Sequence, residues 1–142
     1  MSAVPSAVLL DTHALVWLVD GDRRLLSAAR KRITTAAQDS QLWVSAITPW
    51  EVAMLVAKGR LSLNRDAMDW VDAALALPGL RLAPIEPAIA VASTRLPGDI
   101  HGDPSDRLIV ATARHLGATL VTADAQLLAY GALGHVAVLA AA

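Results

Sequence analysis

Short apolar runs alternate with helix-like stretches along this 142-residue chain. The first run, residues 7–10, has no polar side chain and is typical of a strand buried on both faces. Strand-like runs recur later, with helical patterns between them, at residues 41–45, 80–85, 118–122 and 136–139. Strands separated by helices need right-handed crossovers and form a parallel sheet covered on both sides. The sequence therefore predicts an α/β fold, a three-layer α/β/α domain around a five-stranded parallel sheet.

Composition narrows the class of protein. The length suits one domain, and no repeat, low-complexity segment or linker divides residues 1–142. The chain is 55% hydrophobic, but no apolar run reaches the roughly 18 residues of a membrane span. The first residues lack the basic and apolar regions of a secretory signal, so we do not expect export. The sequence has no cysteine, which excludes disulfides and thiolate metal sites. We expect a cytoplasmic protein without a membrane segment.

Acidic residues recur where the predicted strands end. Asp11 follows the first strand directly, and Asp124 follows the fourth by two residues. Glu51 lies in the first turn of the helix after the second strand, and Asp106 in the first turn of the helix before the fourth. Ligands of open parallel sheets bind beyond the carboxyl ends of the strands. Carboxylates gathered there repel one another unless a cation joins them, so the pattern favours Mg²⁺ or Mn²⁺.

Each of these acids also has a simpler, local interpretation. Asp11 and Asp124 are good N-cap residues for the helices that follow them. Thr48-Pro-Trp-Glu51 has the form of a capping box, in which Glu51 would bond the Thr48 amide instead of a metal. In His101-Gly-Asp103-Pro-Ser-Asp106-Arg107, Asp103 is a helix N-cap and the proline fits the first helical position. His13 and His101 are interpreted as packing or loop residues.

The ordered set of motifs resembles the PIN-domain ribonucleases of the VapC toxin type. The matching segments are VLLDTHALVWLVDGD, SAITPWEVAMLVAKGRL, HGDPSDRLIVATA and LVTAD, which together span nearly the whole chain. The resemblance implies a metal-dependent endoribonuclease that cleaves RNA, acts as a toxin and is inhibited by a VapB-type antitoxin. It also implies a homodimer. Ser105, where alanine or an aromatic residue is more usual, and the lack of phenylalanine are mild departures.

The resemblance assigns roles to particular residues. The four family acids, taken as catalytic residues and as ligands of Mg²⁺ or Mn²⁺, fall on Asp11, Glu51, Asp106 and Asp124. Roles in supporting the metal ligands or positioning the substrate fall on Asp103, Thr12, Thr122 and Arg107. For Arg107, an RNA phosphate and a neighbouring acid such as Asp103 are both plausible partners.

Two other observations complete the sequence-based picture. The helical stretches 48–58 and 65–77 carry more apolar residues than one core-facing stripe needs, which predicts either a partner or burial in a larger core. A rival function is Mg²⁺-dependent aspartyl phosphotransfer, which requires a lysine at a strand end. Both lysines, Lys31 and Lys58, fall on predicted helices, which disfavours it. A non-catalytic PIN-like binding module is the other alternative.

Overall fold

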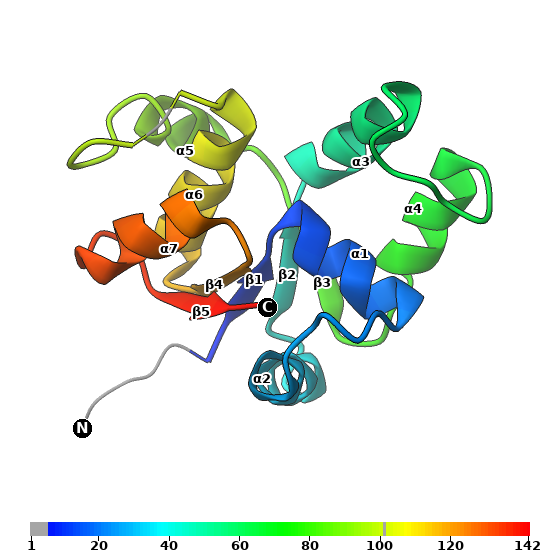
Figure 1. Cartoon of the computed structure of the whole chain (residues 1–142). Coiled ribbons are helices and arrows are strands. Elements are labelled where there is room, and N and C mark those ends of the chain that lie inside the picture. Colours follow the sequence, from blue (N-terminus) through cyan, green and yellow to red (C-terminus); the bar gives the residue numbers. More distant parts are fainter. Residues whose placement is uncertain (1–5, 101) are drawn as a thin grey trace.

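The computed structural model describes residues 6–100 and 102–142 and contains one sheet of five parallel strands. The strands are β1 (Val8–Leu10), β2 (Leu42–Ser45), β3 (Leu80–Ala83), β4 (Thr119–Thr122) and β5 (Val138–Ala140). Their spatial order is β3-β2-β1-β4-β5, so the direction of winding reverses between β1 and β4 (Figure 1). The parallel α/β fold is confirmed, and so is the prediction that the third strand lies at an edge.

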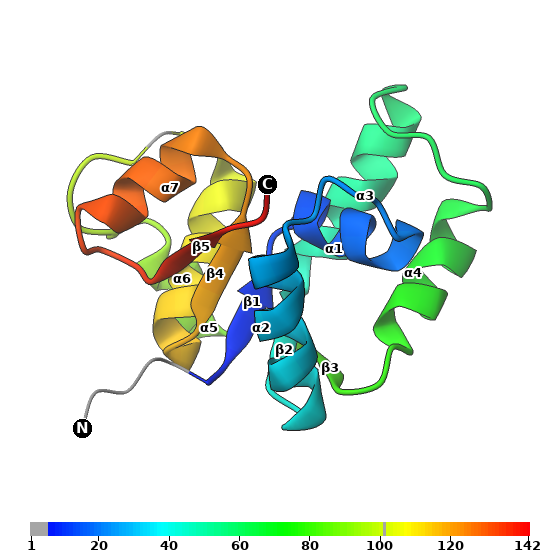
Figure 2. The same cartoon turned by 60° about the horizontal axis from the view of Figure 1, so that its bottom comes forward.

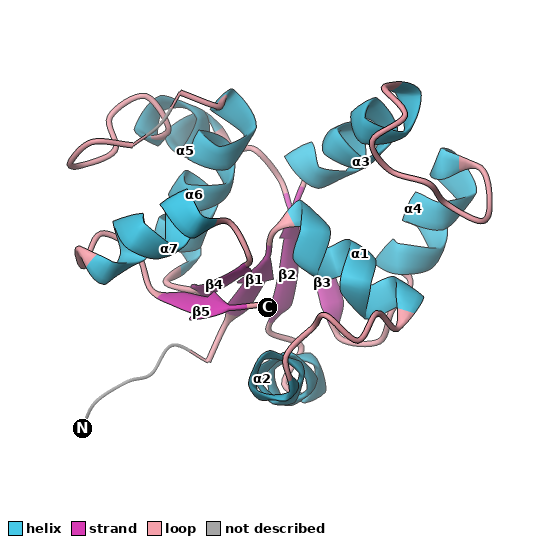
Figure 3. Cartoon of the chain, in the orientation of Figure 1, coloured by secondary structure: helices cyan, strands magenta, loops and turns pink. Residues whose placement is uncertain are grey.

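Seven helices connect the strands within the described part of the chain (Figure 3). They are α1 (Thr12–Asp20), α2 (Ser27–Gln38), α3 (Ile47–Ala57), α4 (Ala67–Leu75), α5 (Pro87–Ala92), α6 (Pro104–Leu116) and α7 (Ala125–Ala132). None of them has the length and apolarity needed to cross a bilayer.

The alternation of side chains along the strands builds a core on each face of the sheet. In β1, Val8 and Leu10 pack into the core that contains residues of α1, α2 and α4, whereas Leu9 packs into the core under α6 and α7. All three side chains are fully buried. Figure 2 shows the sheet between these two groups of helices. A parallel sheet covered in this way explains why its strands lack the polar alternation of a half-exposed sheet.

Helix ends follow the local signals in most places. Asp103 accepts a hydrogen bond from the Ser105 amide at the start of α6, and Gly117 ends that helix in the left-handed conformation. The largest differences from the predicted boundaries lie near the end of the chain. Helix α7 continues to Ala132, four residues beyond the expected end, and β5 begins at Val138, two residues later than expected. The added turn places Tyr130 in the core, so burial extends the helix beyond the local signals.

The register of the sheet fixes where the acidic residues meet. Leu10 at the end of β1 pairs with Val44 of β2 and Val121 of β4. The segments that follow these three strands therefore start side by side at the carboxyl end of the sheet. This position lies beside the point where the winding reverses. Open parallel sheets bind their ligands at such a position.

Candidate active site

A pocket of about 460 Å³ lies at this edge of the sheet. It is lined by all four predicted acids and by Asp103, together with Thr12, His13, Trp17, Met54, Leu55, Arg60, Ile109 and Ala123. Its carboxylates come from the segments after β1 and β4 and from helices α3 and α6. Residues from four separate parts of the chain thus share one hollow. Other hollows exist on the molecule, one of them larger, but this one gathers the acids.

Thr122 joins the two acids that follow neighbouring strands. Its hydroxyl donates to Asp11 Oδ2 and accepts a hydrogen bond from the Asp124 amide at 3.0 Å. Asp11 Oδ1 accepts from the Ala14 amide at 2.9 Å and caps α1. Both Thr122 and Asp11 are buried. Burial raises the pKa of Asp11, while the hydrogen bonds from Thr122 and Ala14 act against that rise.

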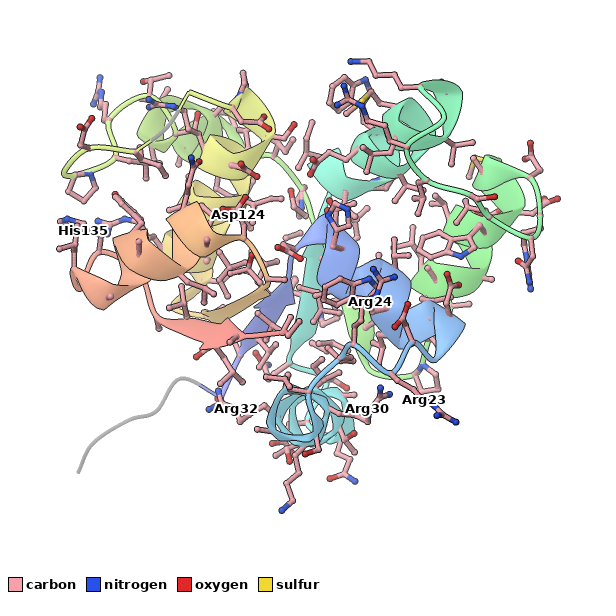
Figure 4. The ribbon with its side chains drawn as sticks, viewed as in Figure 1. Arg23, Arg24, Arg30, Arg32, Asp124 and His135 are labelled. Carbon is pink, nitrogen blue, oxygen red and sulfur yellow. The ribbon has the colours of Figure 1, made fainter. Side chains whose placement is uncertain are left out.

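Asp124 also serves its own helix. One carboxylate oxygen, Oδ1, accepts from the amides of Gln126 (2.8 Å) and Leu127 (3.2 Å) at the start of α7. Figure 4 shows Asp124 at the inner end of this helix. Asp11 and Asp124 therefore act as helix caps and line the pocket at the same time, so the local and the functional interpretation of these residues are compatible. Each carboxylate has a second oxygen that capping does not use.

Glu51 is held by a distant threonine. Thr12 Oγ1 donates to Glu51 Oε1 at 2.7 Å, and the hydroxyl oxygens of Thr12 and Thr48 lie 3.4 Å apart. The capping-box interpretation is wrong, because α3 begins at Ile47 and Thr48 lies inside the helix, where no side chain caps it. Burial raises the pKa of Glu51, and the charges of Asp103 and Asp11 add to the effect.

Asp106 is the acid whose pKa the other carboxylates of the pocket affect most broadly. Its carboxylate accepts no hydrogen bond from the described residues. Burial first, and then the charges of Asp103, Asp124, Glu51 and Asp11, raise the pKa of Asp106 to about 7. The four other acids all act on this one carboxyl group. A cluster of like charges with one strongly perturbed member is typical of a functional site.

The basic residues near the pocket differ from the sequence-based picture. Arg107 forms no ion pair with an acid among the described residues; its Nη2 donates to the Ile100 carbonyl at 2.9 Å. His13 lies in the first turn of α1 and lines the pocket, so the prediction of a packing or loop residue is wrong. Arg60, which no motif singled out, also lines it. His101 lies outside the described residues. The only sequence signal for His13 is its place at the start of a helix that follows a strand.

The donor chemistry of the pocket suits a hard divalent cation. Five carboxylates line it, and oxygen donors of this kind are the ligands of Mg²⁺ and Mn²⁺. Their mutual repulsion, visible in the raised pKa of Asp106, is what a bound cation would relieve. As the described side chains are placed, no three His, Asp or Glu residues form a ready ligand group. Several carboxylate oxygens are instead occupied by hydrogen bonds.

Known proteins share this architecture. The chain is 36% identical over 122 residues to ribonuclease VapC22 of Mycobacterium tuberculosis, which covers 86% of this chain and 90% of that protein. The structure resembles VapBC2 from Rickettsia felis bound to a DNA fragment from their promoter (TM-score 0.69, 18% identity, 94% and 98% of the two chains). It also resembles a toxin–antitoxin complex from Klebsiella pneumoniae (TM-score 0.58, 25% identity, 83% and 87%). The PIN domain family matches residues 8–133, so this chain belongs to the PIN-domain family.

Proposed function

We propose that the chain is a metal-dependent endoribonuclease that acts as the toxin of a VapBC-type toxin–antitoxin pair. The observation that carries the proposal is the gathering of five carboxylates in one pocket at the switch point of the sheet. The similarity to ribonuclease VapC22 over most of both chains supports RNA as the substrate. The proposed location is the cytoplasm, where an RNA substrate would be met. Residues 1–142 would form one domain.

The acids would divide the work between them. Asp11, Asp106 and Asp124 would hold a cation, Mg²⁺ or Mn²⁺, and Glu51 would complete its surroundings or orient the attacking water. A bound divalent cation would supply activation of a water and neutralise charge on the phosphodiester. Thr12 fixes the Glu51 carboxylate, and Thr122 fixes that of Asp11. These bonds hold acidic side chains in place before a substrate arrives, which limits the reorganisation needed for catalysis.

The rest of the pocket favours a phosphodiester over the rival substrates. Arg60 and His13 line the same hollow and offer donors to phosphate oxygens. Aspartyl phosphotransfer would need a lysine beside the acids. Lys31 lies on α2 and Lys58 at the end of α3, and neither lines the pocket. Asp103 and Arg107 would position the substrate, Arg107 through the segment whose carbonyl it binds.

A VapB-type antitoxin is the proposed partner, and a homodimer the proposed assembly. Structural neighbours include a VapBC complex and a toxin–antitoxin complex. The apolar excess predicted on α3 and α4 is only partly absorbed by the core. Val52 and Trp70 are buried, whereas Trp50 is 56% and Met68 59% exposed. Exposed large apolar side chains on neighbouring helices are typical of an interaction surface.

The test is cleavage of a pool of single-stranded RNA by the purified chain with Mn²⁺ or Mg²⁺, with and without EDTA. We expect cleavage that EDTA abolishes and that Asp106→Asn lacks. Asp72→Asn, which removes an exposed carboxylate on α4 away from the pocket, should cleave like the unaltered chain. Cleavage that persists in EDTA would contradict metal dependence. No cleavage with either ion would favour the non-catalytic binding module.

A further inference from the structure

A second, smaller hollow of about 220 Å³ adjoins the acidic pocket. Among the described residues, Asp106 is the one that lines both hollows. The other residues of this second hollow come from α7, from the position directly after it and from residues 99–100: Asp99, Ile100, Gln126, Leu127, Ala129, Tyr130 and Leu133. A molecule that reacts at the acidic pocket would therefore have room for a neighbouring group on the far side of Asp106.

The described residues 97–100, which form one wall of this hollow, are held at two points. The Tyr130 hydroxyl donates to the Pro97 carbonyl on one side. On the other side, Arg107 Nη2 donates to the Ile100 carbonyl at 2.9 Å. Gly98 has φ +68° and packs so closely against His135 that a Cβ there would lie 2.6 Å from Nε2. Figure 4 shows His135 beyond the end of α7, facing this loop.

The His135 ring also lies 4.7 Å from that of Tyr130, centroid to centroid. A hydrogen bond from Tyr130 therefore holds the loop to α7, and one from Arg107 holds it to α6. Gly98 of the loop also packs against His135, which follows α7. Binding sites need such fixed walls, because a mobile wall must be ordered at a cost when a ligand binds. The hollow is part of the folded structure in this sense.

The lining suits a flat, uncharged ring with hydrogen-bonding edges. Ile100 and Leu133 offer apolar contact. Leu133 is 70% exposed, so its side chain is available to a ligand. Gln126 offers an amide that both donates and accepts, and the Asp99 carboxylate accepts. Two carboxylates, Asp99 and Asp106, make the hollow unfavourable for a phosphate. A nucleobase meets these conditions, since its faces are apolar and its edge is polar.

From this geometry we infer that the second hollow binds the nucleobase adjoining the scissile phosphate and gives the enzyme a base preference there. The inference rests on the proposed ribonuclease function. Asp99 accepts from an exocyclic amino group, so adenine, cytosine and guanine are preferred over uracil, which has none. Gln126 contacts the same edge. The RNA strand then crosses Asp106, with its phosphate on the side of Arg60 and its base on the side of Gln126.

The first test maps cleavage ends in a randomised single-stranded RNA pool, using the full chain with Mn²⁺. The unaltered chain should under-represent uracil at one position beside the cut. In Asp99→Asn and Gln126→Ala the discrimination at that position should fall roughly tenfold, and positions further away should not change. Gln38→Ala and Asp39→Asn, exposed residues at the end of α2, are the matched controls and should keep the preference.

The second test does not need cleavage. Adenosine, cytidine, guanosine and uridine are titrated into methyl-labelled protein, and the methyl signals of Ile100 and Leu133 are followed by NMR. The three nucleosides with amino groups should shift these signals more than uridine, and Asp99→Asn should remove the difference. If the chain cleaves RNA but both variants keep the preference, the base site is refuted and the ribonuclease stands. If the chain cleaves no RNA, the ribonuclease proposal fails. If, in addition, all four nucleosides give equal and negligible shifts of the Ile100 and Leu133 signals, the base site is refuted as well.

Discussion

Replacing Asp106 with asparagine should stabilise the fold while it abolishes RNA cleavage. The carboxyl group has an ordinary pKa of 3.8 and a pKa of about 7 in the folded chain, because of burial and of four neighbouring acids. Below pH 3.8 the group carries its proton in both states and has no effect. Between 3.8 and about 7 the folded chain keeps a proton that the unfolded chain has lost, so stability falls as pH rises. Above pH 7 the full penalty remains.

The size of this penalty follows from the two pKa values. The gap between 3.8 and about 7 corresponds to about 4 kcal/mol at 1.36 kcal/mol for each pH unit. Asp106 is only half-buried, so solvent screening reduces this to about 2 kcal/mol. For a chain of this length that is about 6 °C in Tm. Asparagine has nearly the same shape and no charge, so the variant should gain this amount at pH 8 and almost nothing at pH 4.

Thermal unfolding in EDTA, at pH 4 and pH 8, measures the effect. Asp72→Asn removes an exposed charge outside the pocket and should change stability by less than about 0.5 kcal/mol at either pH. Adding Mg²⁺ at pH 8 should raise the Tm of the unaltered chain and leave that of Asp106→Asn unchanged, because a ligand stabilises only the state that binds it. A variant no more stable than the parent at pH 8, or equally stabilised at both pH values, would refute the electrostatic argument.

Three further outcomes are expected. Thr122→Val should lower the free energy of unfolding by about 1–3 kcal/mol, measured by urea denaturation, because it leaves Asp11 and the Asp124 amide without their buried partner; a change below 0.5 kcal/mol would contradict this. Gly98→Ala should lower Tm, since φ is +68° and the added Cβ meets His135. EDTA should abolish RNA cleavage, and Mn²⁺ added in excess of the EDTA should restore it. Cleavage that returns on adding metal-free buffer alone would count against a metal.

The fold was predictable because its signals are local. An apolar run such as residues 7–10 and a cap such as Asp103 depend on residues within a few positions of each other, and both appear in the structure as expected. Pro84, which cannot donate to a neighbouring strand, predicted an edge position, and β3, which ends one residue before it, lies at an edge. Because parallel strands end at one side of the sheet, the sequence also placed Asp11 and Asp124 on the same side.

Tertiary structure decided what the local signals could not. Glu51 had a plausible capping partner three residues away, but its hydroxyl partner is Thr12, 39 residues distant, because α3 starts early and lies beside α1. The hollow beyond Asp106 depends on a loop tied to α7, which no motif announces. Periodicity and capping act over one helical turn, whereas the partner of a carboxylate is set by the order of the strands. Sequence alone therefore determined which acids the chain has and which side of the sheet they occupy, and the packed structure determined their partners.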